Sequence, residues 1–494
     1  MKQTKSSPCA RAIPVRGGQL SRKERRELAR QIQSDQITLQ IVHSNAAGID
    51  VGKNTHYVAV PPDRDAEPVR YFDSCTDGLQ QMVAWLKKCG ITSVALQSTG
   101  VYWIALYDLL QEADFEVYLV NARYTKSLPG RKSDVQESQW LMKLHTYGLL
   151  PNSFRPPQEI RWLRSYWRQR QNHVCSAASC IHRMDKVLTE MNVRLSSAVT
   201  DLSGATGLAI IQAIVDGERD PHELAAYRDP RVKATQEEIA RQLHGNWQAD
   251  GVFRLKQELQ AYRFCQTLIA ECDQELAKLL RAFPDRSAGV ALAEETRKGR
   301  RKKKRGNSPQ FDLRQLLYLM SGVDLARIDG IDVITAMTVV AEAGYDMSPW
   351  PTADHFVSWL RLAPDNRISG DKVIGKGRTP TQNRLTQALK MAASSLQASK
   401  TYLGAQLRRL RARRGPAVAV KAMAAKLARL VYNMLRHGME YVDRGIEFYE
   451  QQQRERRLHA LAKNAAQLGF QLAVVYCERS SKSPSRVAKS FLAN

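Results

Sequence analysis

The stretch Gly48-Ile-Asp-Val-Gly-Lys-Asn-Thr-His-Tyr-Val-Ala-Val60 decides the fold, because it predicts a β-hairpin with a buried first strand. Two apolar runs flank a Gly-Lys-Asn turn, which is a typical signal for paired antiparallel strands. Asp50 lies in the middle of the first run, between Ile49 and Val51. A buried carboxylate is costly unless it is paired or binds a metal, so Asp50 is a candidate site residue.

Downstream of this hairpin the pattern alternates between helices and strands. We expect a helix at about 77–89, a strand at 92–96, a helix opened by residues 97–103, and a strand at 117–120. The order strand, hairpin strand, strand, helix, strand, helix, strand, helix is that of an α/β ribonuclease-H-like (RuvC-like) fold. In that fold the acid of the first strand, the end of the fourth strand and a late helix meet at one metal site.

The last of these helices begins with two acids that follow a basic Pro-Gly loop. Asp134 and Glu137 are three residues apart and therefore share one helical face, and Arg131 and Lys132 stand directly before them. Carboxylates that face a divalent cation, with cations in the adjacent loop, suit a site that handles phosphate oxygens. The alternative is a solvated first turn, since the helix dipole favours acids there.

The charge of the chain points to a polyanionic partner. Over 494 residues the net charge is +25, spread along the chain rather than confined to one tail. Such a surface attracts nucleic acid in a salt-dependent way, and an anionic membrane is the weaker alternative. No run approaches the roughly 18–20 apolar residues that span a bilayer. We therefore expect a cytoplasmic protein of bacterial type, associated with the nucleoid when bound to DNA.

Composition and periodicity divide the chain into six regions. Apolar residues at three- and four-residue spacing predict two long helices, at 161–192 and 253–280, that form an antiparallel coiled coil. We expect Tyr166 on the apolar stripe of the first helix and Phe264 on a second covered face of the other. The expected regions are a basic arm (1–45), an α/β domain of ribonuclease-H-like fold (46–155), the helical region (156–290), a basic flexible loop (291–310), a second, mostly helical domain (311–446) and a basic tail (447–494).

Several basic segments are candidates for contact with phosphates. The run 297–305 has eight cations in nine residues and cannot pack, so we expect a loop that binds polyanions. The cations of the first long helix favour the same contact, although a charged face is usually only solvated; they are Arg161, Arg164, Arg168, Arg170 and Lys186. Residues 407–414 are predicted to be a basic link between helices at about 383–399 and 416–446. A turn and Ala-rich helix at 328–344 resemble a helix-hairpin-helix unit, but Asp332 replaces a glycine of its phosphate-binding turn.

Residues 365–378 are predicted to form a basic loop around a serine. Ser369 lies between Arg367 and Lys372, and Lys376 follows after a short interval. The glycines of this loop allow the backbone to approach a ligand closely, and its cations suit a transition state with extra charge on phosphate. A lone Ser-Gly pair is by itself ordinarily a turn.

Taken together, these motifs resemble the IS110 family of insertion-sequence transposases. The resemblance rests on GIDVGK around Asp50, STGVYW at 98–103, PGRKSDV at 129–135, GLLPNSFRPP at 148–157 and LAPDNRISG at 362–370. It implies that residues 46–155 form a RuvC-like DEDD nuclease domain and that residues 311–446 form a C-terminal serine transposase domain. The implied metal ligands are Asp50, Gln97, Asp134 and Glu137. Two residues depart from the family pattern, since Gln97 replaces an acid and Glu137 replaces the usual aspartate. The amide oxygen of Gln97 brings no charge, which leaves two interpretations: the site binds Mg²⁺ more weakly, or the chain is a partly inactive copy of the transposase.

The same resemblance implies an activity and its partners. The family excises and integrates an insertion sequence by strand exchange, with Ser369 as the nucleophile and Mg²⁺ as the cofactor. Donor and target double-stranded DNA, a structured noncoding guide RNA and a homodimer or homotetramer are the implied partners. Two alternatives are a hydrolytic junction nuclease that needs no serine and a decayed copy that only binds nucleic acid. The cations expected to contact nucleic acid are Arg131, Lys132, Arg300, Arg301, Lys302, Lys303, Arg367, Lys372, Lys376, Arg378 and Arg384.

Overall fold

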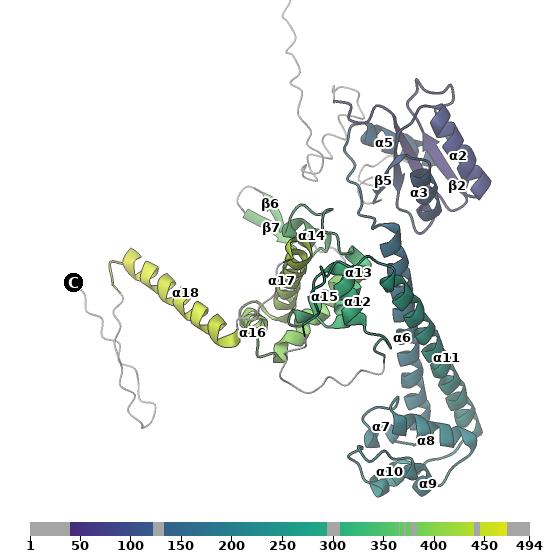
Figure 1. The fold of residues 1–494 in the computed structure, drawn as a ribbon, viewed down its shortest axis with the longest axis vertical. Helices are drawn as coiled ribbons and strands as arrows, with labels where there is room; N and C mark the ends of the chain where they lie inside the picture. The colour runs from purple at the N-terminus through teal and green to yellow at the C-terminus, as the bar shows by residue number, and fades with distance from the viewer. Residues whose placement is uncertain are drawn as a thin grey trace, which may run out of the picture. The chain divides into compact units, whose positions relative to one another are not determined.

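This computed structural model describes residues 40–121, 133–293, 307–364, 366–369, 372–376, 383–438 and 445–471. The chain divides into two compact units, Met1–Arg155 and Pro156–Asn494, and each is described by itself (Figure 1). Most of the predicted basic arm and all of the run 297–305 lie outside the described residues, as do Arg131, Lys132 and Arg378. The side chains of Arg367, Lys372 and Lys376 also lie outside the described part.

The first unit is built on a mixed five-stranded sheet of order β3-β2-β1-β4-β5. β1 (Ala46–Val51) pairs antiparallel with β2 (Thr55–Ala59), and β2 pairs antiparallel with β3 (Val69–Asp73). On its other side β1 pairs parallel with β4 (Ser93–Gln97), which pairs parallel with β5 (Glu116–Val120). The predicted hairpin and the predicted order of strands and helices are confirmed.

Helices cover both faces of this sheet. α2 (Thr76–Lys88) and α3 (Trp103–Glu112) pack on the face that carries Ile49 and Leu96. α5 (Asp134–Thr146) lies on the opposite face, where its apolar side chains form a second, smaller core with Ala95 and Val120. Since both faces are covered, the central strands are almost entirely buried, as their continuous apolar runs predict.

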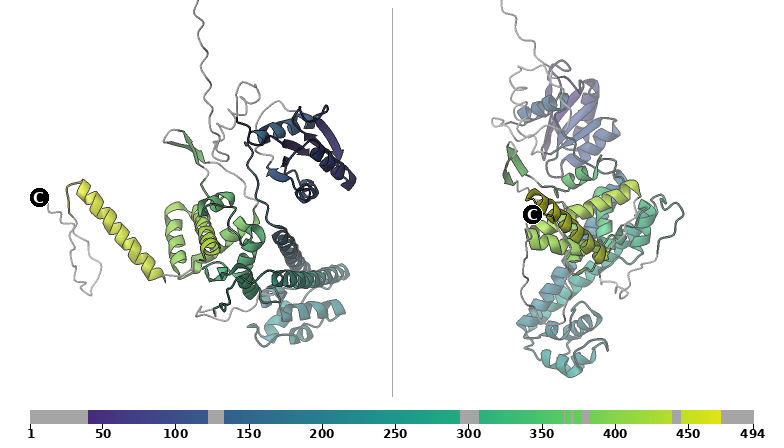
Figure 2. Two further views of the ribbon diagram at one scale, coloured as in Figure 1. Left: turned by 45° about the horizontal axis from the view of Figure 1, so that its top comes forward. Right: turned by 90° about the vertical axis from the view of Figure 1, so that its left-hand side faces the viewer.

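Two helices of 33 residues each, α6 (Gln158–Glu190) and α11 (Ala249–Arg281), form the stem of the second unit (Figure 2). Arg170 pairs with Asp273, and Arg183 pairs with Glu258, so the partner's number falls as the number along α6 rises. The two helices are therefore antiparallel, as predicted, whereas a coiled-coil supercoil stays a prediction. Four short helices lie between them in sequence, namely α7 (Leu195–Ala198), α8 (Ala205–Asp216), α9 (Pro221–Ala226) and α10 (Gln236–Gln242).

Two burial predictions for the long helices were wrong. Tyr166 is 40% exposed and Phe264 is 64% exposed, because the stripe that joins α6 to α11 is narrower than the sequence pattern indicates. Three of the five cations of α6 that were expected to contact phosphates instead make internal contacts. Arg164 and Arg168 form ion pairs with Glu342, and the buried Arg170 also donates to the carbonyl of Asn307 at 3.0 Å.

In the C-terminal part of the second unit, α14 (Ala353–Trp359), α15 (Arg384–Ser395) and α16 (Tyr402–Arg414) pack against α17 (Pro416–His437), whose Ala- and Leu-rich face is buried. Residues 407–414, expected to link two helices, lie inside α16, and the expected tail begins within α18 (Gly445–Gln467). No helix in the described ranges is both long enough and apolar enough to cross a membrane. The other elements are α12 (Leu313–Ser321), η1 (Leu325–Arg327), α13 (Val333–Ala343), β6 (Asn366–Ser369), β7 (Lys372–Lys376) and η2 (Leu396–Ala398).

Candidate functional site

Asp50 and Gln97 occupy neighbouring positions at one end of the central strands. Ile49 is paired with Leu96 in the parallel ladder of β1 and β4, and Asp50 and Gln97 are the next residues of each strand. Neighbours in a ladder point to the same face, and alternate residues along a strand share a face. Asp50 and Gln97 therefore lie on the face of Gly48, which is the face covered by α5. Gln97 is 2% exposed and Asp50 is half-buried.

The backbone of α5 lies directly on β1 at Gly48. A Cβ at this position would be 2.2 Å from the Met142 backbone nitrogen and 2.4 Å from the Ser138 carbonyl oxygen. Only glycine permits this approach. Ser138 directly follows Glu137, so the first turns of α5 lie close to the strand that carries Asp50.

The direction of α5 is fixed by a contact at its other end. The Nε2 atom of His145 lies 2.7 Å from the Oγ atom of Ser93, the first residue of β4. Because the last turn of α5 meets the beginning of β4, its first turn points toward the ends of β1 and β4. Asp134, which is exposed, and Glu137, which is half-buried, therefore lie toward the same sheet edge as Asp50 and Gln97. Ser133 caps this turn by accepting a hydrogen bond from the Gln136 backbone nitrogen at 3.4 Å.

These four residues have the right chemistry for a hard cation but do not form a compact acidic cluster. Carboxylate and amide oxygens are the ligands that Mg²⁺ prefers. In the described part of the chain, however, no three His, Cys, Asp or Glu side chains form a group suited to holding a metal ion. The fold therefore brings the predicted residues to one edge and one face, and Gln97 supplies an oxygen without the charge of an acid.

A stacked pair of histidines at the opposite end of α5, one of them buried, was not predicted. The ring of His145 is 1% exposed and stacks on His43 with centroids 4.4 Å apart. Burial, followed by the nearby His43, lowers the pKa of His145 to about 3. His145 is therefore neutral at physiological pH and anchors the helix through Ser93. No sequence motif links residues so far apart, so sequence reasoning had no signal for this contact.

Ser369 is the last residue of β6, the first strand of a two-stranded hairpin, whereas an open loop was predicted. β6 pairs antiparallel with β7, Ser369 stands opposite Lys372, and a bulge lies between Arg367 and Ile368. The prediction was wrong because the glycines and charges of this segment obscure its short alternating pattern. Ser369 is exposed, which leaves its hydroxyl accessible to a substrate.

Asn383 and Arg384, which follow Ser369 in sequence, have different roles at the start of α15 (Arg384–Ser395). The side chain of Asn383 caps α15 by accepting a hydrogen bond from the Leu385 backbone nitrogen at 2.9 Å. Arg384, the first residue of α15, is exposed and stays a candidate for phosphate contact.

The helix-hairpin-helix segment has a structural role in this chain. Asp332 caps α13 by accepting from the backbone nitrogen and hydroxyl of Thr335, both at 2.8 Å, so a carboxylate occupies the position where phosphate would bind.

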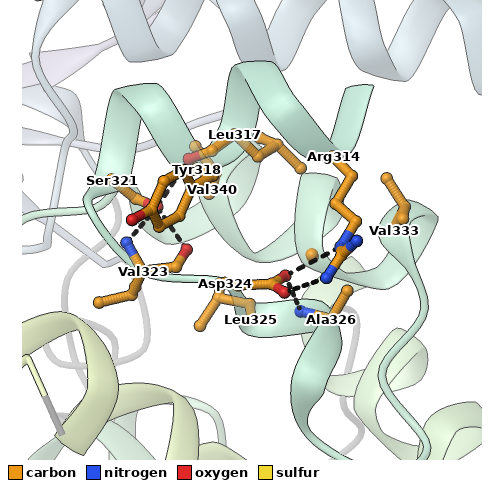
Figure 3. Close-up of a pocket in the computed structure, with 11 residues that line it drawn as sticks. Arg314, Leu317, Tyr318, Ser321, Val323, Asp324, Leu325, Ala326, Val333 and Val340 are labelled. Carbon is orange, nitrogen blue, oxygen red and sulfur yellow. Dashed lines mark hydrogen bonds and ion pairs between the residues drawn. The ribbon is translucent and has the colours of Figure 1, made fainter. Parts of the chain in front are cut away.

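Arg314 forms an ion pair with Asp324 at 2.6 Å beside a cavity of about 10 Å³ (Figure 3). Such a cavity has room for roughly one water molecule and not for a ligand.

The N-terminal unit, with its mixed sheet and an acid-bearing helix packed on the first strand, defines a ribonuclease-H-like nuclease domain. A family model for the DEDD transposase domain of IS110 elements matches residues 47–193, and a model described as Transposase IS116/IS110/IS902 family matches residues 322–408. Together the two matches show that the chain is an IS110-family transposase with a DEDD N-terminal domain. Transposition of an insertion sequence, DNA binding and the use of a divalent metal follow from this family. No curated protein matches the chain.

Proposed function

We propose that this transposase exchanges DNA strands through a covalent bond between Ser369 and DNA. The observation that supports the proposal most strongly is the exposed position of Ser369 at the turn end of a hairpin, within the matched C-terminal domain. Cations flank this serine in sequence, as expected for a group that works on a phosphodiester.

In the proposed step the Ser369 oxygen attacks the phosphorus of the scissile phosphodiester. A new bond forms between the serine oxygen and phosphorus, and the bond to one deoxyribose oxygen breaks. The serine proton leaves to a base or water, and the departing deoxyribose oxygen takes up a proton. One phosphodiester bond is exchanged for another, so a hydroxyl of a second strand can reverse the reaction and join a new partner without an external energy source.

The acidic edge of the first unit would supply the metal ligands. We propose that Asp50, Asp134 and Glu137 hold Mg²⁺, with the Gln97 amide oxygen beside them. A bound Mg²⁺ would neutralise charge on the phosphate oxygens. Asp50 and Gln97 are suited to this role because their strands hold them rigidly, whereas Asp134 and Glu137 depend on the packing of α5 at Gly48.

We further propose that a structured noncoding RNA guides the reaction and that the protein works as a homodimer or homotetramer. The charge of +25 supports binding of more than one nucleic acid. In such an assembly the serine and the carboxylates of one site come from different protomers, as the family resemblance implies. The exposed faces of α6 and α11, including Tyr166 and Phe264, are candidate assembly surfaces.

Cleavage of labelled donor DNA in the presence of Mg²⁺ and the element's RNA tests the proposal. The wild-type protein should cleave, and both Ser369→Ala and Asp50→Ala should abolish cleavage. Cleavage that survives Ser369→Ala but not Asp50→Ala would instead identify the hydrolytic nuclease. An inactive wild type whose activity returns with Gln97→Glu would identify a decayed copy.

A further inference from the structure

α16 and α18 are neighbouring helices of the second unit (Figure 1). A groove between them is lined by arginines from both helices. Arg408 and Arg409 line it from α16, and Arg454 and Arg457 line it from α18, against a single acid, Glu450. The groove has a volume of about 480 Å³. Ligand sites are typically roughly 300–1,000 Å³, so the groove is large enough for a ligand.

Buried aromatic packing fixes the two walls of this arginine groove. Tyr449 of α18 is 6% exposed, and its ring meets that of Tyr402 edge-on with centroids 5.0 Å apart. The Tyr402 hydroxyl donates to Gln452 Oε1 at 3.4 Å, and Lys426 Nζ lies 4.7 Å from the centre of the Tyr402 ring. The spacing between the two rows of arginines is therefore set by the core and not by the arginines themselves.

Most of the charge in the arginine groove is available to a ligand. Arg409, Arg454 and Arg457 make no ion pair or hydrogen bond within the described ranges, and Arg454 and Arg457 are exposed. Arg408 is the exception, because it donates to the carbonyl oxygens of Ser399 at 2.6 Å and Gln397 at 3.1 Å.

The like charges of the four lining arginines repel one another and raise the local electrostatic potential in the groove. An anion with several charges, spaced along the groove, would relieve this repulsion.

We propose that the arginine groove binds the phosphodiester backbone of a nucleic-acid strand, at a place separate from the strand-exchange residues. Guanidinium groups fit phosphate oxygens in a bidentate manner, which favours phosphate over a single small anion for a row of arginines. The lining offers few groups that distinguish one base from another, so binding is independent of sequence. The groove lies mostly beyond the matched residues 322–408 and requires neither Ser369 nor a metal.

Fluorescence anisotropy on the full chain tests this proposal, with labelled random-sequence RNA, single-stranded DNA and duplex DNA titrated over a range of salt concentrations. The test variant is Arg454→Gln/Arg457→Gln. The matched control is Arg413→Gln/Arg414→Gln, which removes the same charge from exposed positions of α16 outside the lining. Each lost contact to a single strand should reduce the salt slope by roughly 0.7, so the test variant should lose about 1.4 and bind at least about tenfold more weakly. The control should keep most of the wild-type slope.

The kind of nucleic acid that the test variant binds more weakly identifies the ligand of the groove. A loss confined to RNA assigns the groove to the guide RNA, a loss confined to DNA assigns it to donor or target, and equal losses assign it to either backbone. Equal losses of affinity in the test and control variants would overturn the proposal, because overall charge and not the groove would then determine binding. Unchanged affinity in the test variant would also overturn it. Circular dichroism checks that both variants are folded. Because binding is measured and not cleavage, the result is independent of the role of Ser369.

Discussion

Gly48→Ala tests how the fold holds the acidic helix in place. The added methyl would lie 2.2 Å from the Met142 nitrogen and 2.4 Å from the Ser138 oxygen, where ordinary contacts are 3.4–4 Å. Both obstructing atoms belong to the α5 backbone, so the helix must move from β1 by about 1 Å, because a packed interior has no free space. Overpacking of this kind costs about 3 kcal/mol, at the upper end of its usual range. Asp134 and Glu137 would move with the helix.

Hydrogen exchange followed by mass spectrometry localises this effect. A loss of about 3 kcal/mol corresponds to roughly 100-fold faster exchange of α5 amides. For a domain of this size it also lowers the melting temperature by about 12 °C.

Gly204→Ala is the control, because the nearest atom to its methyl is the Asp201 oxygen at 3.1 Å and its φ of −74° suits alanine. It should cost about 1 kcal/mol or less. Unchanged protection of α5 in Gly48→Ala would refute the close packing of helix and strand.

Three further predictions follow from the buried polar groups. Asp273→Ala should destabilise the second unit by about 3–5 kcal/mol in urea unfolding, because it leaves Arg170 buried and unpaired, whereas Arg170→Met/Asp273→Leu should recover most of that loss. Because the pKa of His145 is lowered from 6.5 to about 3, the unfolded chain binds a proton that the folded chain excludes. The contribution of His145 to the free energy of unfolding should therefore be complete above pH 6.5 and should fall toward pH 3 by up to about 1.4 kcal/mol per pH unit. In chemical denaturation, His145→Gln should make the free energy of unfolding less dependent on pH over this range. Gln97→Glu should lower the Mg²⁺ concentration needed for cleavage, and an unchanged Mg²⁺ requirement would show that Gln97 does not limit metal binding.

The first unit was predictable from the sequence because its signals are local and agree with one another. The Gly-Lys-Asn turn fixes the hairpin, and the alternation of apolar strands with amphipathic helices fixes the order of the other elements. Parallel pairing then places Asp50 beside Gln97, as the predicted fold requires. The close packing of α5 at Gly48 was not predictable, since a glycine in a strand indicates close approach of some backbone without saying which.

Other features depend on tertiary contacts that carry no local signal. Arg164 and Arg168 look like a basic surface in the sequence, and only the position of Glu342 on a distant helix turns them into internal ion pairs. The sequence predicts a loop around Ser369 because glycine and charge dominate the segment and its first strand has only four residues. The arginine groove arises from the packing of Tyr449 on Tyr402, in a region where the sequence predicts only a basic link and a tail.

The most direct test of the central claim is to map the covalent bond between the protein and DNA. The protein is incubated with donor and target DNA, RNA and Mg²⁺, denatured, digested with nuclease and trypsin, and analysed by mass spectrometry. The account predicts that a nucleotide remains attached to the tryptic peptide that contains Ser369, between Arg367 and Lys372, and that Ser369→Ala gives no such peptide. Cleaved DNA with no modified peptide, or a nucleotide attached to another residue, would contradict it.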